Sequence, residues 1–155
     1  MAPSTADSTR QVRVGVASVI TGADGRMILG RRKGSLGAGH YGFPGGHLEF
    51  GESYFECAER EALEETGLRI KATNVFAVAN SVFDSEHHYI TLFVQCHQLD
   101  PEERPRVLEP EKCTGWQFMS WDDIKSIVAK GEEQLFLPIA NLLRENPNPE
   151  RLIKD

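Results

Sequence analysis

Hydrophobic and polar residues alternate near the start of the chain, and the apolar pattern resumes after a turn. Val12, Val14 and Val16 lead into a run that ends at Ile20, "ADG" supplies a turn, and "RMILGRR" continues the run. Alternation with a period of two is typical of a β-strand, and two such runs joined by a short turn are typical of a β-hairpin. The pattern therefore predicts a hairpin over residues 12–32.

The next segment, "KGSLGAGHYGFPGG", has glycine at positions 34, 37, 39, 42, 45 and 46. So many glycines disfavour a regular element, although residues 41–44 could form a short strand. A glycine-rich backbone can approach another molecule closely because no side chain intervenes. This segment is predicted to be a surface loop at a binding site.

Helix signals bracket residues 53–67. Ser53 is a suitable N-cap, Glu56 stands three residues later as a capping box requires, and Gly67 is a typical residue at a helix end. We expect a helix between these signals.

The rest of the chain alternates between strand and helix patterns. "NVFAVANSVF" (74–83) and "HHYITLFVQCHQL" (87–99) are rich in β-branched and aromatic residues and predict two adjacent strands. Next comes a charged, Pro-rich loop over 99–115. It is followed by a strand over 115–119, a helix over 121–130 and a last helix over 132–145, which Pro138 limits or kinks. This order predicts an α/β fold in which helices cover both faces of a mixed central sheet.

Composition narrows the class of protein. A chain of 155 residues with 40% hydrophobic residues suits one domain, residues 11–155, behind a flexible polar tail of residues 1–10 that does not resemble a signal peptide. No segment is apolar enough to span a membrane. Three cysteines without close pairing indicate a reducing compartment, the cytoplasm or the nucleus. The net charge of −6 and the lack of a basic stripe argue against binding polymeric nucleic acid.

Negative charge is concentrated in the predicted helix and the turn before it. From Glu49 to Glu65 the chain has seven glutamates and one arginine, so this stretch carries −6, as much as the whole chain. At about 100° per residue, Glu61, Glu64 and Glu65 share one arc beside an apolar stripe. Like charges three and four residues apart destabilise a helix unless a cation lies between them, and oxygen ligands favour Mg²⁺, Mn²⁺ or Ca²⁺ over zinc. The alternative is a solvated acidic helix face.

The same residues resemble the Nudix box. The fixed positions of the box are reproduced in order by Gly46, then after five residues Glu52, then after seven residues Arg60-Glu61, followed by Leu63, Glu64-Glu65 and Gly67-Leu68. The one departure is the small Ala62. The flanking strands are consistent with the Nudix αβα sandwich over nearly the whole chain. "GRRKGSLGAGHYGFPGGHLEFGES" and "EPEKCTGW" further resemble the MutT-related nucleotide pyrophosphohydrolases of eukaryotes.

The resemblance implies roles for the residues of the box. In such enzymes Mg²⁺, with Mn²⁺ as a possible substitute, is held by glutamates of the helix, helped by the carbonyl group of a glycine. The cation neutralises the phosphates and lowers the pKa of the water that splits a diphosphate linkage. The implied metal ligands are Gly46, Glu52, Glu61, Glu64 and Glu65. Glu64 is the first candidate for the residue that orients the water, Glu65 is the second, and Glu109 or Glu111 is a candidate outside the box. Arg60 could orient a carboxylate of the box.

Residues outside the helix could bind the substrate. Arg31, Arg32 or Lys33 could contact the outer phosphates, or they could be solvated charges at a strand end. His47 could reach a phosphate, or it could be an ordinary turn residue. Phe136 resembles a residue that lines the base pocket in similar enzymes, and the alternative is a core aromatic. The predicted substrate-binding residues are Arg31, Arg32, Gly45, His47, Glu111 and Phe136.

The sequence thus predicts a Mg²⁺-dependent hydrolase that converts a nucleoside triphosphate, possibly modified, into the monophosphate and pyrophosphate. Two alternatives remain open: a hydrolase of a nucleoside diphosphate linked to another group, and a non-catalytic nucleotide-binding Nudix domain. The expected partner is a small-molecule nucleotide and not a membrane. Homodimerisation is plausible from the resemblance alone.

Overall fold

The computed structural model describes residues 10–34, 36–131 and 134–154. Within these ranges the chain forms strands, helices and a short 3-10 helix, η3. Their order is β1 (Val12–Ile20), β2 (Met27–Arg32), β3 (Tyr41–Gly42), β4 (Gly45–His47), α1 (Tyr54–Thr66), β5 (Ile70–Val82), β6 (His88–Gln98), β7 (Cys113–Met119), α2 (Trp121–Lys130), α3 (Leu137–Glu145) and η3 (Pro149–Leu152).

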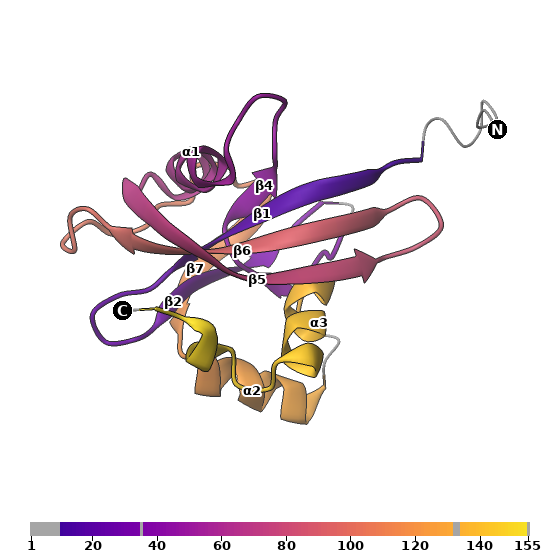
Figure 1. The fold of residues 1–155 in the computed structure, drawn as a ribbon. Coiled ribbons are helices and arrows are strands. Elements are labelled where there is room, and N and C mark those ends of the chain that lie inside the picture. Colours follow the sequence, from indigo (N-terminus) through magenta and orange to yellow (C-terminus); the bar gives the residue numbers. More distant parts are fainter. Residues whose placement is uncertain (1–9, 35, 132–133, 155) are drawn as a thin grey trace.

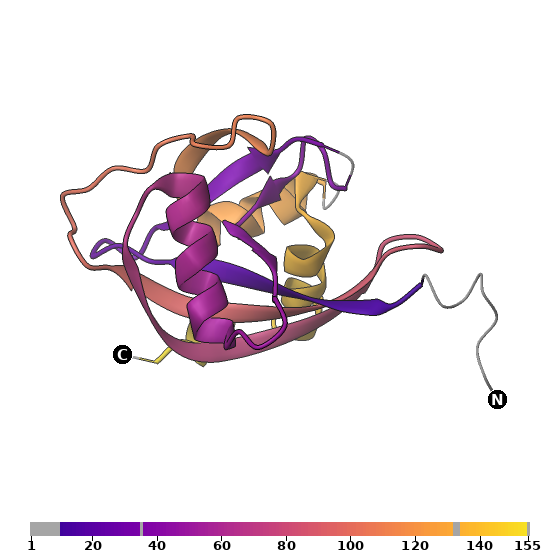
Figure 2. The same cartoon turned by 90° about the horizontal axis from the view of Figure 1, so that it is seen from above.

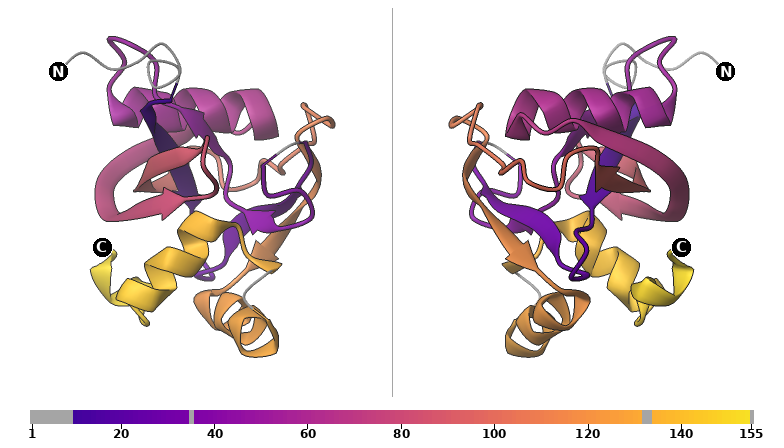
Figure 3. Two further views of the ribbon diagram at one scale, coloured as in Figure 1. Left: turned by 90° about the vertical axis from the view of Figure 1, so that its right-hand side faces the viewer. Right: turned by 90° about the vertical axis from the view of Figure 1, so that its left-hand side faces the viewer.

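The strands form two sheets between layers of helices. The larger sheet has the order β4-β1-β6-β5 and is mixed, since β1 runs parallel to β6 and the other pairs are antiparallel. The smaller sheet is antiparallel, with the order β3-β2-β7. Helix α1 covers one side, while α2 and α3 lie on the other (Figures 1 and 3). The predicted α/β architecture, with a mixed sheet and helices on both faces, is confirmed.

The predicted hairpin over residues 12–32 is wrong. β1 pairs with β4 and β6, whereas β2 pairs with β3 and β7, and the two strands are joined next to their turn by an isolated bridge between Thr21 and Met27. β1 ends in a continuous run of buried residues and β2 begins with one, so buried and exposed residues do not alternate there. A strand with both faces buried packs between two layers. β1 and β2 are thus interior strands of two different sheets, each with a partner strand on both sides.

Helix α1 begins and ends where its signals predict. The Ser53 hydroxyl accepts a hydrogen bond from the Glu56 N–H at 3.0 Å, and the Glu56 carboxylate accepts one from the Ser53 N–H at 3.1 Å. Gly67 follows with a φ of 76°, in the left-handed region that favours glycine. The predicted helix over 121–130 is confirmed as α2. Figure 2 shows α1 lying across the strands of the larger sheet.

Some predicted boundaries are wrong. β5 begins at Ile70, four residues before the predicted strand at 74. The predicted start of the last helix, Glu132, lies outside the described residues, and α3 begins at Leu137. Pro138 therefore lies in the first turn of α3 and limits the helix at its start, the first of the two predicted effects. Proline is accommodated there because the first helical N–H groups have no partner within the helix. The glycine-rich segment also contains β4, which its composition concealed.

Two hydrophobic clusters fill the space between the layers. One includes Phe43, Phe93, Trp121, Ile139 and Leu142 and packs α2 and α3 against the sheets. The other lies under α1 and includes Val16, Ile28, Cys57, Ala62 and Val94. Ala62, the small residue of the box, is fully buried, so a larger side chain is not needed there. No helix among the described residues is long and apolar enough to cross a membrane.

Candidate active site

Two glycines of β4 bring the backbone against α1. The Gly45 N–H donates a hydrogen bond to Oε2 of Glu65 at 2.7 Å. A Cβ atom at Gly45 would overlap the Val16 carbonyl oxygen, and one at Gly46 would overlap the carboxyl group of Glu61. β4 therefore requires glycine at both positions to pack this closely on β1 and on the glutamates of α1.

Glu61 and Glu65 are buried carboxyl groups. Their exposed fractions are 6% and 9%. Burial raises the pKa of Glu65 to about 8, although the hydrogen bond from Gly45 acts in the opposite direction. Burial also raises the pKa of Glu61, and Oε2 of Glu61 has no hydrogen-bond partner among the described residues. The site thus holds two carboxyl groups whose charge the protein alone does not fully compensate.

Arg60 links the glutamates of the box. Its guanidinium group contacts both oxygens of Glu52, at 2.7 and 3.0 Å, and also lies 2.7 Å from Glu61 and 3.3 Å from Glu64. These hydrogen bonds lower the pKa of Glu52 to about 2 and raise the pKa of Arg60. Arg60 thus occupies the position expected of a residue that orients carboxylates, and its bidentate partner is Glu52.

Glu64 lies apart from the buried pair. Its side chain is half-exposed, at 48%, and turns toward Arg60. Within residues 10–34, 36–131 and 134–154, no group of three or more His, Cys, Asp and Glu side chains stands close enough together to hold a metal ion. The structure brings together Glu61, Glu65 and the Gly46 backbone. Glu64 and Glu52 are held at their edge by Arg60.

The buried pair nevertheless fits a divalent cation. Glu61 presents a buried oxygen that has no hydrogen-bond partner in the described part of the chain, and Glu65 is a carboxyl group that burial destabilises in its charged form. Mg²⁺ is typically held by one or two carboxylates, with waters and substrate phosphates completing its six ligands. The two carboxylates are therefore enough to supply the protein side-chain ligands of such an ion.

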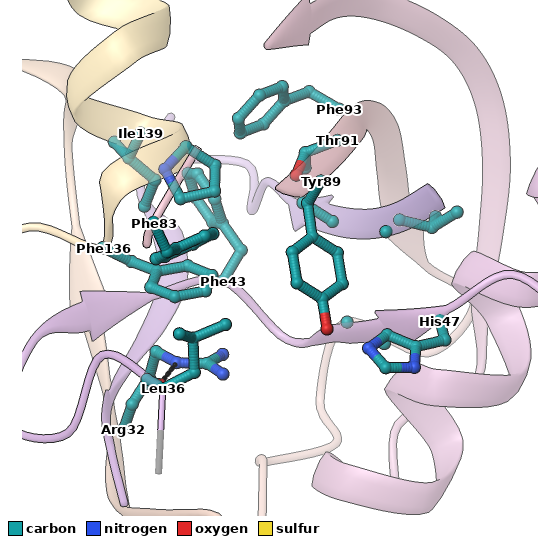
Figure 4. Close-up of a pocket in the computed structure, with 16 residues that line it drawn as sticks. Arg32, Leu36, Phe43, His47, Phe83, Tyr89, Thr91, Phe93, Phe136 and Ile139 are labelled. Carbon is teal, nitrogen blue, oxygen red and sulfur yellow. Dashed lines mark hydrogen bonds between the residues drawn. The ribbon is translucent and has the colours of Figure 1, made fainter. Parts of the chain in front are cut away.

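Two adjoining cavities lie next to these glutamates. The first, of about 120 Å³, is mostly apolar and is enclosed by aromatic side chains (Figure 4). The second, of about 650 Å³, is lined by charged groups that include Glu61 and Glu65. The residues that line both are Arg32, Leu36, Gly45, Gly46, His47 and Tyr89. The two cavities therefore form one continuous site with an apolar end and a charged end.

Phe136 lies in the wall of the apolar cavity, as the sequence suggested. The guanidinium carbon of Arg32 lies 3.8 Å from the centre of its ring, and the Phe83 ring lies 5.3 Å away. Nε of Arg32 donates a hydrogen bond to the Leu36 carbonyl oxygen at 3.1 Å. Figure 4 shows Phe136, Phe83 and Arg32 on one side of the cavity and Tyr89 on the other. A flat aromatic group would fit between these two sides.

The two arginines at the end of β2 have different surroundings. Arg32 lines both cavities, and burial lowers its pKa. Arg31 stacks on Tyr41 at 4.4 Å, donates a hydrogen bond to the Gly39 carbonyl oxygen at 3.0 Å, and lines neither cavity. Successive side chains of a strand point to opposite faces. The structure therefore places Arg32, and not Arg31, at the site.

His47 and Glu111 both line the charged cavity. The imidazole of His47 lies 5.3 Å from the Tyr89 ring, and burial, followed by the charges of Arg13, Lys112 and Arg32, lowers its pKa. A neutral imidazole at neutral pH follows, which can donate one hydrogen bond to a substrate.

Several lining residues escaped the sequence analysis, namely Leu36, Phe83, Tyr89, Thr91 and Lys112. A signal for part of this set was present. Tyr89, Thr91 and Phe93 stand two residues apart on β6, and all three line the apolar cavity. Period-two alternation places such residues on one face of a strand. Lys112 lies within "EPEKCTGW", a segment that resembles the MutT-related enzymes, but no strand or helix period marks the residue itself, because it precedes β7 in the loop that follows β6.

Comparisons with known proteins match the chain to one family. The family model described as "NUDIX domain" matches residues 11–138. The m7GpppN-mRNA hydrolase NUDT17 of Xenopus laevis is 33% identical over 116 residues, which are 66% of this chain and 39% of that protein. The oxidized purine nucleoside triphosphate hydrolase of Danio rerio is 44% identical over 46 residues, 30% of each chain. The chain spans less than half the length of each of these relatives.

Solved structures show the same fold. The MutT NUDIX hydrolase of Burkholderia pseudomallei is 30% identical and superimposes with a TM-score of 0.66, covering 74% of this chain and 87% of that one. The MutT protein of Methanosarcina mazei Go1 is 20% identical with a TM-score of 0.73, covering 94% and 98%. The second likeness extends the shared fold over nearly the whole chain.

Proposed function

The chain belongs to the NUDIX domain family, and from this premise we propose that it is a Mg²⁺-dependent nucleotide pyrophosphohydrolase, which converts a nucleoside triphosphate into the monophosphate and pyrophosphate. As a Nudix hydrolase it acts on phosphoric anhydride bonds. The proposal adds the substrate class, the cation and the residues that carry out the reaction.

One observation supports the substrate class most strongly: an aromatic cavity opens into a charged cavity. A nucleotide has the same order of parts, with a flat base at one end and a chain of phosphates at the other. The base fits between Phe136 and Tyr89, and the phosphates extend past the shared residues Arg32 and Gly46 toward Glu61. Stacking on aromatic rings and pairing with fixed charges are the interactions that such a ligand uses.

Glu61, Glu65 and the Gly46 carbonyl group would hold the divalent cation, with Glu64 and Glu52 at the edge of the site. When bound, the cation neutralises negative charge on the phosphates and lowers the pKa of the attacking water. Mg²⁺ fits a set of oxygen donors, and Mn²⁺ is expected to substitute because it accepts the same ligands.

The chain's own residues position these groups. The Gly45 N–H holds one oxygen of Glu65, and Arg60 fixes Glu52 and Glu61. Glu64 is half-exposed and bound by Arg60 at 3.3 Å. A carboxylate with this freedom can accept the proton of a water that attacks phosphorus as the bridging P–O bond breaks. Glu64 is therefore our first candidate for the base and Glu65 the second; Glu109 or Glu111 remains the candidate outside the box.

A second function would be cleavage of a diphosphate that links a nucleoside to another group. Its support is the similarity to a protein named m7GpppN-mRNA hydrolase, together with a 26% identical solved structure titled UDP-X diphosphatase, which superimposes with a TM-score of 0.58. A non-catalytic role is disfavoured because every glutamate of the box is present.

A substrate panel separates these functions. Purified protein with Mg²⁺ would be given nucleoside triphosphates, including oxidised purines, together with a nucleotide sugar and a cap dinucleotide, and the products would be separated by chromatography. The proposal expects the highest kcat/KM for a triphosphate. A higher kcat/KM for the nucleotide sugar or the cap dinucleotide would replace it with the second function.

A further inference from the structure

The charged cavity has a group of cations in addition to its glutamates. The cations are Arg32 and Lys33 at the end of β2 and Lys112 just before β7, and all three line the cavity. The Lys33 N–H donates a hydrogen bond to the Lys112 carbonyl oxygen at 2.8 Å, which joins the two backbone segments. Lys33 and Lys112 therefore project from neighbouring points of the backbone into the same charged end of the site.

The three cations lie in a definite order along the site. Arg32 lines both cavities, whereas Lys33 and Lys112 line the charged cavity alone. A nucleotide whose base occupies the apolar cavity must direct its phosphates past Arg32. The phosphates farthest from the nucleoside then lie at the end of the site that holds the two lysines.

Lys112 has a partner in the described structure that a more highly charged ligand could replace. Its ammonium group is paired with Oε1 of Glu109 at 3.3 Å, and its side chain is half-exposed, at 53%. Glu109 is less exposed, at 26%, and its Oε1 is buried, so a ligand that draws Lys112 away must be a stronger partner than this carboxylate. A terminal phosphate, which carries more negative charge than one carboxylate, meets that requirement. Lys112 lines the same cavity as Glu61 and Glu65, so its charge lies in the region where the phosphates and the cation would meet.

We propose that Lys112 binds the terminal phosphate of the substrate and thereby selects a nucleoside triphosphate over a diphosphate that ends in a neutral group. This inference rests on the proposed function, since it assumes that the base occupies the apolar cavity. A triphosphate ends in a group with two ionisable oxygens, whereas a nucleotide sugar presents an uncharged sugar at the same place. An ammonium group gains much more from the first ligand than from the second.

The test compares Lys112→Gln with Lys112→Arg and with a control, Lys71→Gln, in which an exposed lysine of β5 outside both cavities is changed. Each variant and the wild type would be assayed with a guanosine triphosphate and with a guanosine diphosphate sugar. Loss of one charge-assisted hydrogen bond should lower kcat/KM for the triphosphate by roughly ten- to hundredfold. The value for the sugar nucleotide should change by less than about threefold, and Lys112→Arg should retain most of the preference.

The ratio of kcat/KM for the triphosphate to kcat/KM for the sugar nucleotide measures the selectivity that we assign to Lys112. Any effect of Lys112 on Glu61, Glu65 or the cation is common to both substrates and cancels in the ratio, so an equal loss for both would overturn the selective role. Calorimetric titration of inorganic pyrophosphate with Mg²⁺ adds a readout that does not need turnover, and an unchanged Kd in Lys112→Gln would also overturn it. Wild-type protein that cleaves no triphosphate would refute the proposed function separately.

Discussion

Glu65→Gln probes the buried carboxyl pair directly. Glu65 is 9% exposed, and its Oε2 accepts the Gly45 N–H at 2.7 Å. Glutamine has nearly the same shape and keeps an oxygen that can accept this hydrogen bond. The substitution therefore removes a charge without opening a cavity, so its effect on stability reports the cost of that charge.

The magnitude follows from the raised pKa. Glu65 has a pKa of about 8 in the folded chain, against 4.5 for an ordinary glutamate. Between these values the folded chain keeps a proton that the unfolded chain has lost, so the free energy of unfolding falls as pH rises through this window when no cation is bound. The upper limit is roughly 5 kcal/mol, or about 10–20 °C in Tm for a chain of this size. Glu65→Gln lacks this contribution and should show a flatter dependence on pH.

A bound divalent cation should reverse the loss of stability that ionised Glu65 causes. A ligand that binds the folded chain alone stabilises it by RT ln(1 + [L]/Kd), about 2.7 kcal/mol at one hundred times Kd. Wild type should gain this stability above about pH 8, where Glu65 is ionised. Glu65→Gln should bind the cation more weakly and gain less. In chelator the variant should be the more stable protein, and with Mg²⁺ the difference should narrow or invert.

The assay is thermal melting in chelator and in Mg²⁺ at about pH 6, 7.5 and 9, values that span the window of the linked proton. Glu145→Gln, at the exposed end of α3, is the control for loss of a negative charge elsewhere. Glu56 would be a poor control because its carboxylate completes the capping box of α1. If Glu65→Gln melts with the same pH dependence as wild type, or gains as much from Mg²⁺, the placement of a cation at Glu65 is wrong.

Three further substitutions test separate parts of the site. Glu64→Gln should lower kcat by on the order of a hundredfold or more in saturating Mg²⁺ while the fold is retained, and near wild-type turnover would move the base elsewhere. Phe136→Ala should raise KM or change the ranking of substrates with different bases, because a stacked base contributes about 1–3 kcal/mol. It should also release Arg32, whose guanidinium group lies over the Phe136 ring. An unchanged ranking at unchanged stability would place the base elsewhere. Gly46→Ala should weaken Mg²⁺ binding by roughly tenfold or more, measured by calorimetry, because its methyl group would overlap the carboxyl group of Glu61, and an unchanged Kd would contradict that reasoning.

The helix of the box could be predicted because its signals are local. Ser53, Glu56 and Gly67 act on backbone groups within a few residues of themselves, so their spacing alone fixes the ends of α1. The position of Glu61 and Glu65 beside the apolar stripe follows from the helical period in the same way. Their burial under β4 does not, since it depends on glycines that pack against a distant strand, β1.

The features that sequence reasoning missed depend on non-local pairing. Whether β1 and β2 form a hairpin is decided by β6 and β7, which come much later in the chain. The choice between Arg31 and Arg32 depends on which face of β2 lines the cavities. The sequence does not mark that face, and it does not mark the shift in pairing register between Gly30 and Arg32 either. Periodicity could not place Lys112 at the site either, because the backbone hydrogen bond between Lys33 and Lys112, which brings Lys112 to the end of β2, joins segments that are far apart in the chain.

The central claim is that the two adjoining cavities form one site for the hydrolysis of a nucleoside triphosphate. The most direct measurement is the product ratio from a single triphosphate incubated with the protein in Mg²⁺ and in chelator. The account predicts one nucleoside monophosphate and one pyrophosphate for each triphosphate consumed, with turnover abolished by the chelator and restored by Mg²⁺. Formation of the diphosphate and orthophosphate, or turnover that is unaffected by the chelator, would contradict it.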